Sequence, residues 1–364
     1  MKILHVADLH LAVSEHEYCL SVLEEIVALA AREQVGLLLL AGDVFDTLDD
    51  AEALRGEFEA RLEALPADCA PIYVPGNHEA LGANAQRRLG LFSFGKRVTM
   101  ASDVQLLPVS PEVELLLIPH RPKFDDYQAW KIPPKQAAYR IAVAHGTVAG
   151  LAFLGPGVEE EDVEGGGIID PDLFLFHRVD YAALGHLHAG RTARPAPGLL
   201  VAYPGSARVW RRGEAGPRHA LLLDLIAGVE PKEVALASAG QWRSIELAIA
   251  QDGTVDVSPA AAMAAREDWL EVVLSGVVDD DTRRDEAVRT VARGLKDRVR
   301  CLDVQASPEK VLVLDGISEN KVVRGFLDVW ARRLAESPEP DRAAWHRARD
   351  IGLRRIVSVV GAQS

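Results

Sequence analysis

The stretch YAALGHLHAGR, residues 181–191, places two histidines directly after a short apolar run. An uninterrupted apolar run of this length is typical of a β-strand that is buried on both faces. His186 and His188 follow at positions i and i+2, so a continuing strand pleat would turn both imidazoles to the same side. A single histidine at a strand end is usually a core or surface residue. Two histidines on one side point to a metal site.

Four other apolar runs end in the same kind of residue. The runs are KILHVAD ending on Asp8, VGLLLLAGD ending on Asp43, APIYVPGNH ending on Asn77 and His78, and YRIAVAH ending on His145. In layered α/β sheets, ligand sites gather at the carboxyl ends of the strands. We therefore expect one site that gathers Asp8, His10, Asp43, Asn77, His145, His186 and His188.

The donor types of these seven side chains indicate which metals they bind. Carboxylate, imidazole and amide oxygen without thiolate favour manganese, iron or zinc over calcium or a soft metal. Seven ligands exceed what one ion needs, and one bridging carboxylate would give each of two ions four contacts. The sequence thus predicts two divalent metal ions, with manganese preferred and iron or zinc as alternatives.

The order of the apolar patterns predicts the fold class. Helical spacing over 16–34 and 51–65 alternates with the first three strands, and shorter strands follow them. This order predicts an α/β fold, a four-layer α/β/β/α sandwich over 1–228. A strand-helix-strand pattern over 240–312 predicts a small α+β cap domain, and two helical patterns over 316–364 predict a helical C-terminal tail.

Charge and hydropathy bear on partners and location. The net charge of −14 argues against nucleic acid, yet residues 178–218 are locally rich in arginine. The candidate DNA-contacting residues in this segment are Arg191, Arg208, Arg211 and Arg212, and the alternative is a solvated loop. No apolar run is long enough to cross a bilayer and no signal-peptide pattern is present, so we expect a soluble cytoplasmic protein.

Five short motifs resemble a known family. In chain order, DLH, GDVFD, GNHE, AHG and GHLH are similar to the motifs of the calcineurin-like metallophosphoesterases. Within that family, the segments GDVFDT, DLFLFHRVDYAALGHLH and AYPGSARVWRRGEAG resemble the SbcD-type nuclease subunits of bacterial SbcCD complexes.

The resemblance implies roles for individual residues. It assigns Asp8, His10, Asp43 and His188 to one ion, and Asp43, Asn77, His145 and His186 to the other. It also implies that His78 is a catalytic residue that stabilises charge on the phosphate or protonates the leaving oxygen.

The resemblance further implies a metal-dependent DNA phosphodiesterase in DNA repair, with exonuclease and single-strand endonuclease activity. The implied partners are DNA and an SbcC-like coiled-coil ATPase that would dock on the tail helices around Trp330 and Trp345, and a homodimer stays open. Two alternatives remain for the function, a phosphoesterase acting on small nucleotides or phosphoproteins and a DNA-binding scaffold without turnover. For the tail, the alternative is that its apolar stripes pack on the protein itself.

Overall fold

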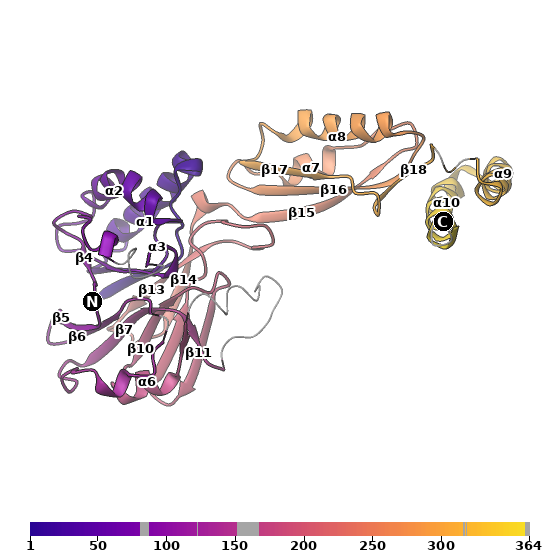
Figure 1. Cartoon of the computed structure of the whole chain (residues 1–364). Helices are drawn as coiled ribbons and strands as arrows, with labels where there is room; N and C mark the ends of the chain where they lie inside the picture. Colours follow the sequence, from indigo (N-terminus) through magenta and orange to yellow (C-terminus); the bar gives the residue numbers. More distant parts are fainter. Residues whose placement is uncertain (81–86, 122, 151–166, 316, 318, 361–364) are drawn as a thin grey trace. The chain divides into compact units, whose positions relative to one another are not determined.

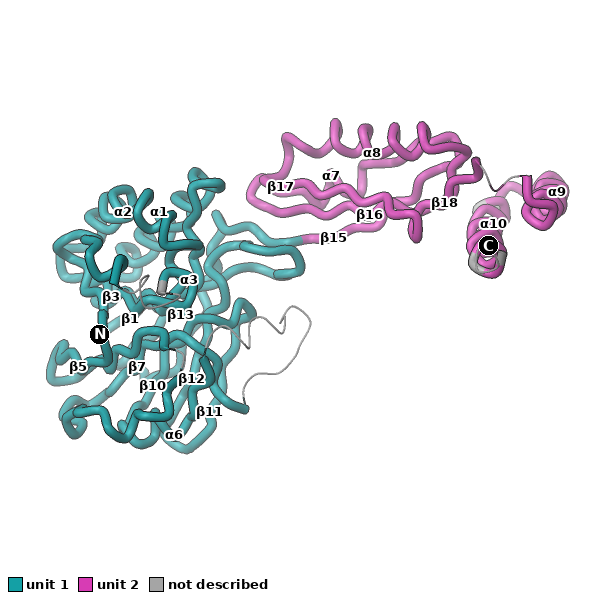
Figure 2. The backbone as a smooth tube through the Cα atoms, in the orientation of Figure 1, with its two compact units in different colours: residues 1–242 teal, residues 243–364 magenta. Residues whose placement is uncertain are grey.

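The computed structural model describes residues 1–80, 87–121, 123–150, 167–315, 317 and 319–360. The chain forms two compact units, residues 1–242 and 243–364 (Figures 1 and 2). The finer division of the sequence into 1–228, 240–312 and 316–364 stays a prediction.

The first unit contains a six-stranded mixed sheet built on the first strand of the chain. In spatial order its strands are β14 (Pro231–Ala235), β13 (His219–Asp224), β1 (Lys2–Val6), β2 (Leu37–Ala41), β3 (Ala70–Val74) and β4 (Thr99–Met100). The strands from β1 to β4 run parallel, with Ile3 opposite Leu37 and Leu37 opposite Ala70. Their carboxyl ends therefore meet at one edge of the sheet.

A second six-stranded mixed sheet faces the first (Figure 1). Its strands, in spatial order, are β11 (Arg191–Ala196), β12 (Leu199–Tyr203), β10 (Tyr181–Gly185), β7 (Tyr139–His145), β6 (Val113–Ile118) and β5 (Gln105–Pro108). The central strands β6, β7, β10 and β12 are parallel, as buried hydrophobic runs favour. A short parallel pair, β8 (Thr147–Val148) and β9 (Ile168–Ile169), follows β7.

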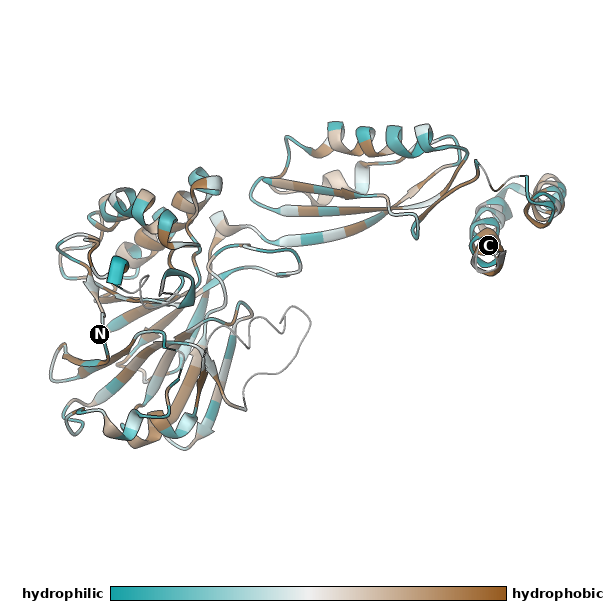
Figure 3. Ribbon diagram, viewed as in Figure 1, coloured by the Kyte–Doolittle hydropathy of each residue, from teal (hydrophilic) through white to brown (hydrophobic). Residues whose placement is uncertain are grey.

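Helices cover the outer faces of both sheets. They are α1 (His16–Arg32) and α2 (Leu48–Leu62) on the first sheet and α6 (Pro171–Phe176) on the second. The short helix α3 (Asn77–Ala80) follows β3, and three 3-10 turns complete the unit, η1 (Val13–Glu15), η2 (Tyr127–Ala129) and η3 (Ala237–Ala239). Ile3 packs between the two sheets and Leu4 packs under the helices, so alternate residues of β1 point to opposite faces of the sheet. Figure 3 shows the strands mostly brown and the outer helix faces mostly teal. The predicted α/β/β/α sandwich is confirmed.

The second unit is a small α+β sheet with helices. Its strands are β15 (Trp242–Ile249), β16 (Trp269–Val278), β17 (Cys301–Gln305) and β18 (Val311–Val313), and its helices in this part are α7 (Ser258–Met263) and α8 (Asp281–Leu295). Asp280 caps α8 by accepting a hydrogen bond from the backbone N–H of Arg283 at 2.9 Å. Val291 and Leu295 of α8 pack on Leu270 and Val272 of β16 to form a separate core.

Two helices follow this sheet, α9 (Lys321–Glu336) and α10 (Glu339–Val360). Trp330 Nε1 donates a hydrogen bond to the carbonyl oxygen of Trp345 at 2.8 Å, so the two predicted tryptophan stripes contact each other. Phe326 and Ile356 of these stripes are partly buried and pack against a small core of Val277, Val323 and Leu353. Part of both stripes therefore packs within the second unit. Among the described residues, no helix combines the length and apolarity needed to cross a membrane.

Candidate metal centre

All seven predicted ligands lie just beyond the carboxyl ends of strands, or at the last residue of one. Asp8 and His10 follow β1, Asp43 follows β2, and Asn77 begins α3 after β3. His145 ends β7, and His186 and His188 follow β10 in the facing sheet. The seven side chains are buried, with no residue more than 7% exposed. The structure thus brings the whole predicted set to one edge of the sandwich.

The backbone is strained where it presents these groups. Six described non-glycine residues have a positive φ, and four of them are predicted ligands: Asp8 (53°), His10 (44°), Asp43 (48°) and His186 (103°). This left-handed region costs an ordinary residue on the order of 1–3 kcal/mol and persists mainly at functional sites. The concentration of strain at these four positions indicates that this edge is a functional site.

Two glycines allow the ligand loops to approach closely. A Cβ atom at Gly76 would lie 2.1 Å from Oδ1 of Asp43, and one at Gly185 would lie 2.0 Å from the carbonyl oxygen of Ala41. Both separations are far below van der Waals contact. Any side chain at either position would push the two strand ends apart.

One group of possible ligands consists of Asp8, His10 and His188. Nε2 of His10 lies 3.2 Å from Nε2 of His188. Nδ1 of His188 donates to Oε1 of Glu214 at 2.5 Å, so in the neutral ring the Nε2 lone pair points toward His10. Asp8 accepts hydrogen bonds from the backbone N–H of His186, at 3.0 and 3.1 Å to its two oxygens.

A second group consists of Asp43, His145 and His186. Nδ1 of His145 donates to the carbonyl oxygen of Ala41 at 3.0 Å. Its Nε2 lies 2.9 Å from Oδ1 of Asn77 and 3.2 Å from Oδ2 of Asp43. The neutral ring therefore directs a lone pair at two oxygens.

These contacts fit divalent cations. In each group, one histidine ring donates a hydrogen bond from one nitrogen to an oxygen atom. The other nitrogen of that ring faces atoms that carry free electron pairs. A carboxylate or backbone carbonyl behind a histidine is the usual arrangement at metal sites, where it fixes the tautomer and orients the ring. Donor atoms that face one another at about 3 Å in a buried site are stabilised by a cation between them. The residues present therefore fit two metal ions.

The electrostatics of the buried carboxylates agree with this interpretation. Burial raises the pKa of Asp8 to about 7, against the opposing effect of His145 and His188. Burial alone would also raise the pKa of Asp43, but the neighbouring His145 holds it well below its ordinary value. In turn, Asp43 outweighs burial and raises the pKa of His145 to about 9. A proton and a divalent cation would thus compete for the same nitrogen of His145.

His78 lies beside the first group and is only partly buried. Its Nδ1 donates to the backbone carbonyl of Asp46 at 2.9 Å, which leaves Nε2 available to another partner. Its backbone N–H donates to Oδ1 of Asp43 at 2.9 Å. His10, Asp46 and His78 form a third group whose possible ligand atoms lie within 4.8 Å of one another. Sequence reasoning assigned no role to Asp46, whose Oδ1 lies 3.2 Å from Nδ1 of His10.

The segment after β12 adds two further residues that sequence reasoning did not select. The indole of Trp210 stacks on the ring of His10, with centroids 4.0 Å apart and an interplanar angle of 10°. Glu214 contacts His188 and also accepts the backbone N–H of Trp210 at 2.8 Å. An aromatic and an acidic residue inside an arginine-rich segment were the signal that could have found them.

Glu79 joins two of the ligand loops. Its Oε1 accepts the backbone N–H of Phe45 at 2.9 Å, and its Oε2 accepts the backbone N–H of Gly76 at 2.8 Å. Burial and the nearby Asp43 raise the pKa of Glu79 to about 7. This carboxyl group therefore joins the loop after β2, which carries Asp43, to the loop after β3, which carries Asn77.

The four arginines predicted to contact DNA differ in their environments. Arg191 and Arg211 are partly buried and Arg212 is exposed. Arg208 is 1% exposed, and its guanidinium donates to the carbonyl oxygens of Leu9 and His10 and to Glu15. Protein acceptors inside the fold thus engage the donors of Arg208, whereas its predicted contact with DNA stays a prediction.

Comparisons with known proteins identify the family of this chain. The family model described as calcineurin-like phosphoesterase matches residues 1–190. One similar solved structure is TT1561 of Thermus thermophilus, with 15% identity, a TM-score of 0.38, and coverage of 65% of this chain and 98% of that chain. Another is a dimetal phosphatase from Danio rerio, with 12% identity, a TM-score of 0.37, and coverage of 65% and 99%.

A third is YfcE, a phosphoesterase from E. coli, with 14% identity, a TM-score of 0.31, and coverage of 65% of this chain and 100% of that chain. Each of these structures aligns over about two thirds of the chain.

Proposed function

Because the chain belongs to the calcineurin-like phosphoesterase family, we propose that it is a two-metal-dependent DNA phosphodiesterase. The family consists of dimetal-dependent phosphoester hydrolases. The finer proposal is exonuclease and single-strand endonuclease activity in DNA repair, as the nuclease subunit of an SbcCD-type complex. Manganese is the proposed metal, with iron or zinc as alternatives.

The proposed ligands divide between the two groups of side chains. Asp8, His10 and His188 would hold one ion, Asn77, His145 and His186 the other, and Asp43 would contact both. Two bound ions would supply Lewis-acid activation of the phosphate and of the attacking water. Glu214 and the carbonyl of Ala41 would keep the metal-facing nitrogens of His188 and His145 free of protons.

His78 is proposed to act on the substrate rather than to bind metal. The carbonyl of Asp46 accepts a hydrogen bond from Nδ1–H, which fixes the orientation of the ring. In the doubly protonated ring, Nε2 would donate a proton or a hydrogen bond to a phosphate oxygen or the leaving oxygen. Partial exposure of the ring supports access to a substrate.

One observation carries the choice of DNA. The segment that supplies Trp210 and Glu214 to the metal centre also carries Arg211 and Arg212. The Cζ atom of Arg211 lies 4.5 Å from the ring centroid of Trp210, which itself stacks on His10. These arginines place positive charge at the rim of the site, where a polyanionic substrate would bind.

The test compares substrates side by side on the same preparation. Labelled single-stranded and double-stranded DNA, a chromogenic phosphodiester and a phosphopeptide are each incubated with manganese, magnesium or zinc. We expect metal-dependent cleavage of DNA that chelation abolishes. Hydrolysis of the phosphopeptide alone would favour a phosphatase, and metal binding without turnover of any substrate would favour a scaffold.

The proposed protein partner is an SbcC-like coiled-coil ATPase. Helices α9 and α10 leave Val329 and Ile351 more than half exposed after their own packing. Val329→Asp and Ile351→Asp should weaken binding of such an ATPase, and Arg332→Asp on the same helix as Val329 serves as a charge control. Unchanged binding in both apolar variants would remove the tail from this role.

A further inference from the structure

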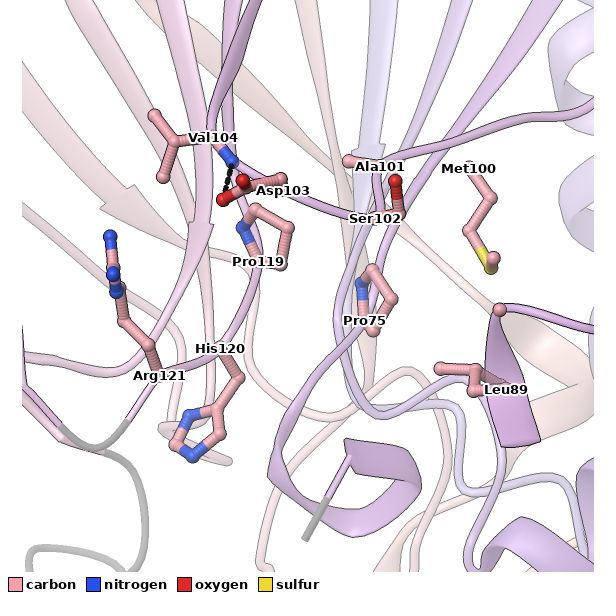
Figure 4. A pocket seen from close by; sticks show the side chains of 11 residues that line it. Pro75, Leu89, Met100, Ala101, Ser102, Asp103, Val104, Pro119, His120 and Arg121 are labelled. Atoms are coloured by element: carbon pink, nitrogen blue, oxygen red, sulfur yellow. Dashed lines mark hydrogen bonds between the residues drawn. The ribbon is translucent and has the colours of Figure 1, made fainter. Parts of the chain in front are cut away.

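A cavity of about 140 Å³ lies at the same edge of the sandwich as the metal centre (Figure 4). Three of its walls follow the carboxyl ends of strands. Pro75 follows β3, residues 100–104 begin at the last residue of β4, and residues 119–121 follow β6. Ligand subsites in such folds gather at this edge. By position, the cavity is therefore a lateral extension of the site described above.

One residue joins the cavity to the metal centre. His120 lines the cavity, and its ring centroid lies 6.3 Å from that of His145. The backbone N–H of His120 donates to the carbonyl oxygen of Pro75 at 3.0 Å, two residues before Asn77. Anything held in the cavity would therefore lie one side chain away from a proposed metal ligand.

The shape and lining of the cavity suit one flat ring. A cavity of about 150 Å³ is known to hold a single aromatic ring. Its interior surface comes from Leu89, Met100, Ala101, Pro75 and Pro119, which offer apolar faces for stacking. This volume has no room for a base pair, so a nucleobase that entered would have to be unpaired.

The polar groups at the rim suit a base better than a phosphate. Ser102 and Asp103 are exposed at the opening, and Arg121 lies across from them (Figure 4). The negative charge of Asp103 would repel a phosphate at this rim. Oδ1 of Asp103 also accepts the backbone N–H of Val104 at 2.7 Å. Hydroxyl, carboxylate and guanidinium groups together can accept from and donate to the edge of a base. A neutral ring with amino and carbonyl groups matches this rim.

We infer that the cavity is a subsite for an unpaired nucleobase of the phosphodiester substrate. This inference rests on the proposed phosphodiesterase function, which it narrows to nucleotide esters with an accessible base. It also gives the site a means of selecting single-stranded ends over paired DNA. A free nucleotide and a single-stranded oligonucleotide present the same base, and the experiment separates these sources.

The test adds a phenyl ring inside or beside the cavity. Ser102→Phe fills the opening, and Gln105→Phe adds the same ring at an exposed position of β5 that does not line the cavity. The probes are thymidine 5′-monophosphate and a short single-stranded oligothymidylate, whose bases are single rings, and calorimetric titration measures their binding. We expect Ser102→Phe to weaken binding of a probe about tenfold or more, the lower range for one stacked base, with Gln105→Phe unchanged.

Met100→Ala offers an independent check, because it removes part of a wall instead of adding a ring. It should also weaken binding of the probe several-fold. Equal binding by wild type and Ser102→Phe, or no binding of either probe by wild type, would overturn the subsite. Stronger binding of the oligonucleotide would assign the subsite to single-stranded DNA, and equal binding would assign it to a mononucleotide.

A kinetic experiment separates this inference from the proposed function. Thymidine 5′-(4-nitrophenyl phosphate) and methyl 4-nitrophenyl phosphate share a leaving group, but only the first carries a base. Ser102→Phe should lower kcat/KM about tenfold for the first substrate and leave the second unchanged. Equal losses for both would overturn the subsite. Failure of wild type to hydrolyse either ester would overturn the phosphodiesterase, while the binding titration would still decide the subsite.

Discussion

The strand ends of the first unit and the sheet of the second unit differ in how some of their buried polar side chains are matched. In the second unit, the buried Asp268 contacts Arg243 at 2.6 Å and the buried Glu271 accepts from Ser244 at 2.7 Å. In the first unit, the nitrogens of His10 and His188 face each other instead. All six described non-glycine residues with positive φ also lie in the first unit.

This difference shows how a functional site can be recognised from physical chemistry. A buried polar group that serves only the fold is satisfied by a partner of opposite character. Groups of like character that converge on strained backbone are costly to the fold, so they indicate a ligand that the fold itself does not supply. Substitutions of matched residues in the two units test this difference.

The largest effect is expected for the two buried aspartates. Asp43→Ala removes the proposed shared ligand and should lower both metal content and kcat, the latter about a thousandfold or more. Asp268→Ala removes an equally buried carboxylate from the second unit and should lower thermal stability without loss of metal. Elemental analysis and steady-state kinetics measure both variants. Loss of metal from Asp268→Ala would break the comparison.

His78→Gln should slow cleavage roughly 100-fold while both ions remain bound. The reason is that one acid or charge-stabilising group is lost without removal of a metal ligand. His346→Gln on α10 is the matched control and should keep the full rate. If His78→Gln loses metal, His78 is itself a ligand, in accord with its place in a group with His10 and Asp46.

Glu214→Gln should weaken metal binding about 10- to 100-fold, the usual cost of losing a carboxylate behind a histidine ligand. The amide keeps the shape of the side chain but removes the charge beside His188. Glu271→Gln, a similar change in the second unit, should leave metal affinity unchanged. Titration against a fluorescent chelator gives both affinities, and equal effects in the two variants would contradict the proposed role of Glu214.

Replacement of Arg211 and Arg212 by alanine should weaken DNA binding about tenfold at moderate salt. Loss of two phosphate contacts should also flatten the slope of log Kd against log salt by about two. The control replaces Arg284 and Arg289 of α8, which pair with acidic neighbours on the helix surface. A comparable change of slope in this control would extend the DNA-binding surface to the second unit.

The smallest effect is expected at a helix cap of the second unit, which contains none of the proposed metal ligands. Asp280→Ala removes the N-cap of α8 and should cost about 1 kcal/mol of local stability. Faster amide hydrogen exchange across 281–295 would report this loss. Metal content and kcat should stay at wild-type values, and a fall in either would mean that the second unit supports the metal centre.

Most of the fold followed from the order of apolar patterns. Runs such as LLLLA at 37–41 are buried on both faces, so their sequence carries no face preference and marks a central strand. The ligand set could be predicted for a related reason, because polar residues that end such runs necessarily lie at the sheet edge. The burial of Arg208 could not be predicted in this way, since the carbonyl oxygens that accept from its guanidinium are 198 and 199 positions away in sequence.

The sequence by itself thus determined the sandwich, the edge on which the site lies and the types of donor atom there. Periodicity and residue chemistry are local, and they survive without knowledge of distant contacts. Only the tertiary structure decided which nitrogen of His145 and of His188 is held by an oxygen acceptor, that Trp210 stacks on His10, and that His120, next to His145, lines a cavity. These features arise where loops from both sheets meet, and no local pattern encodes the distance between segments that the fold brings together.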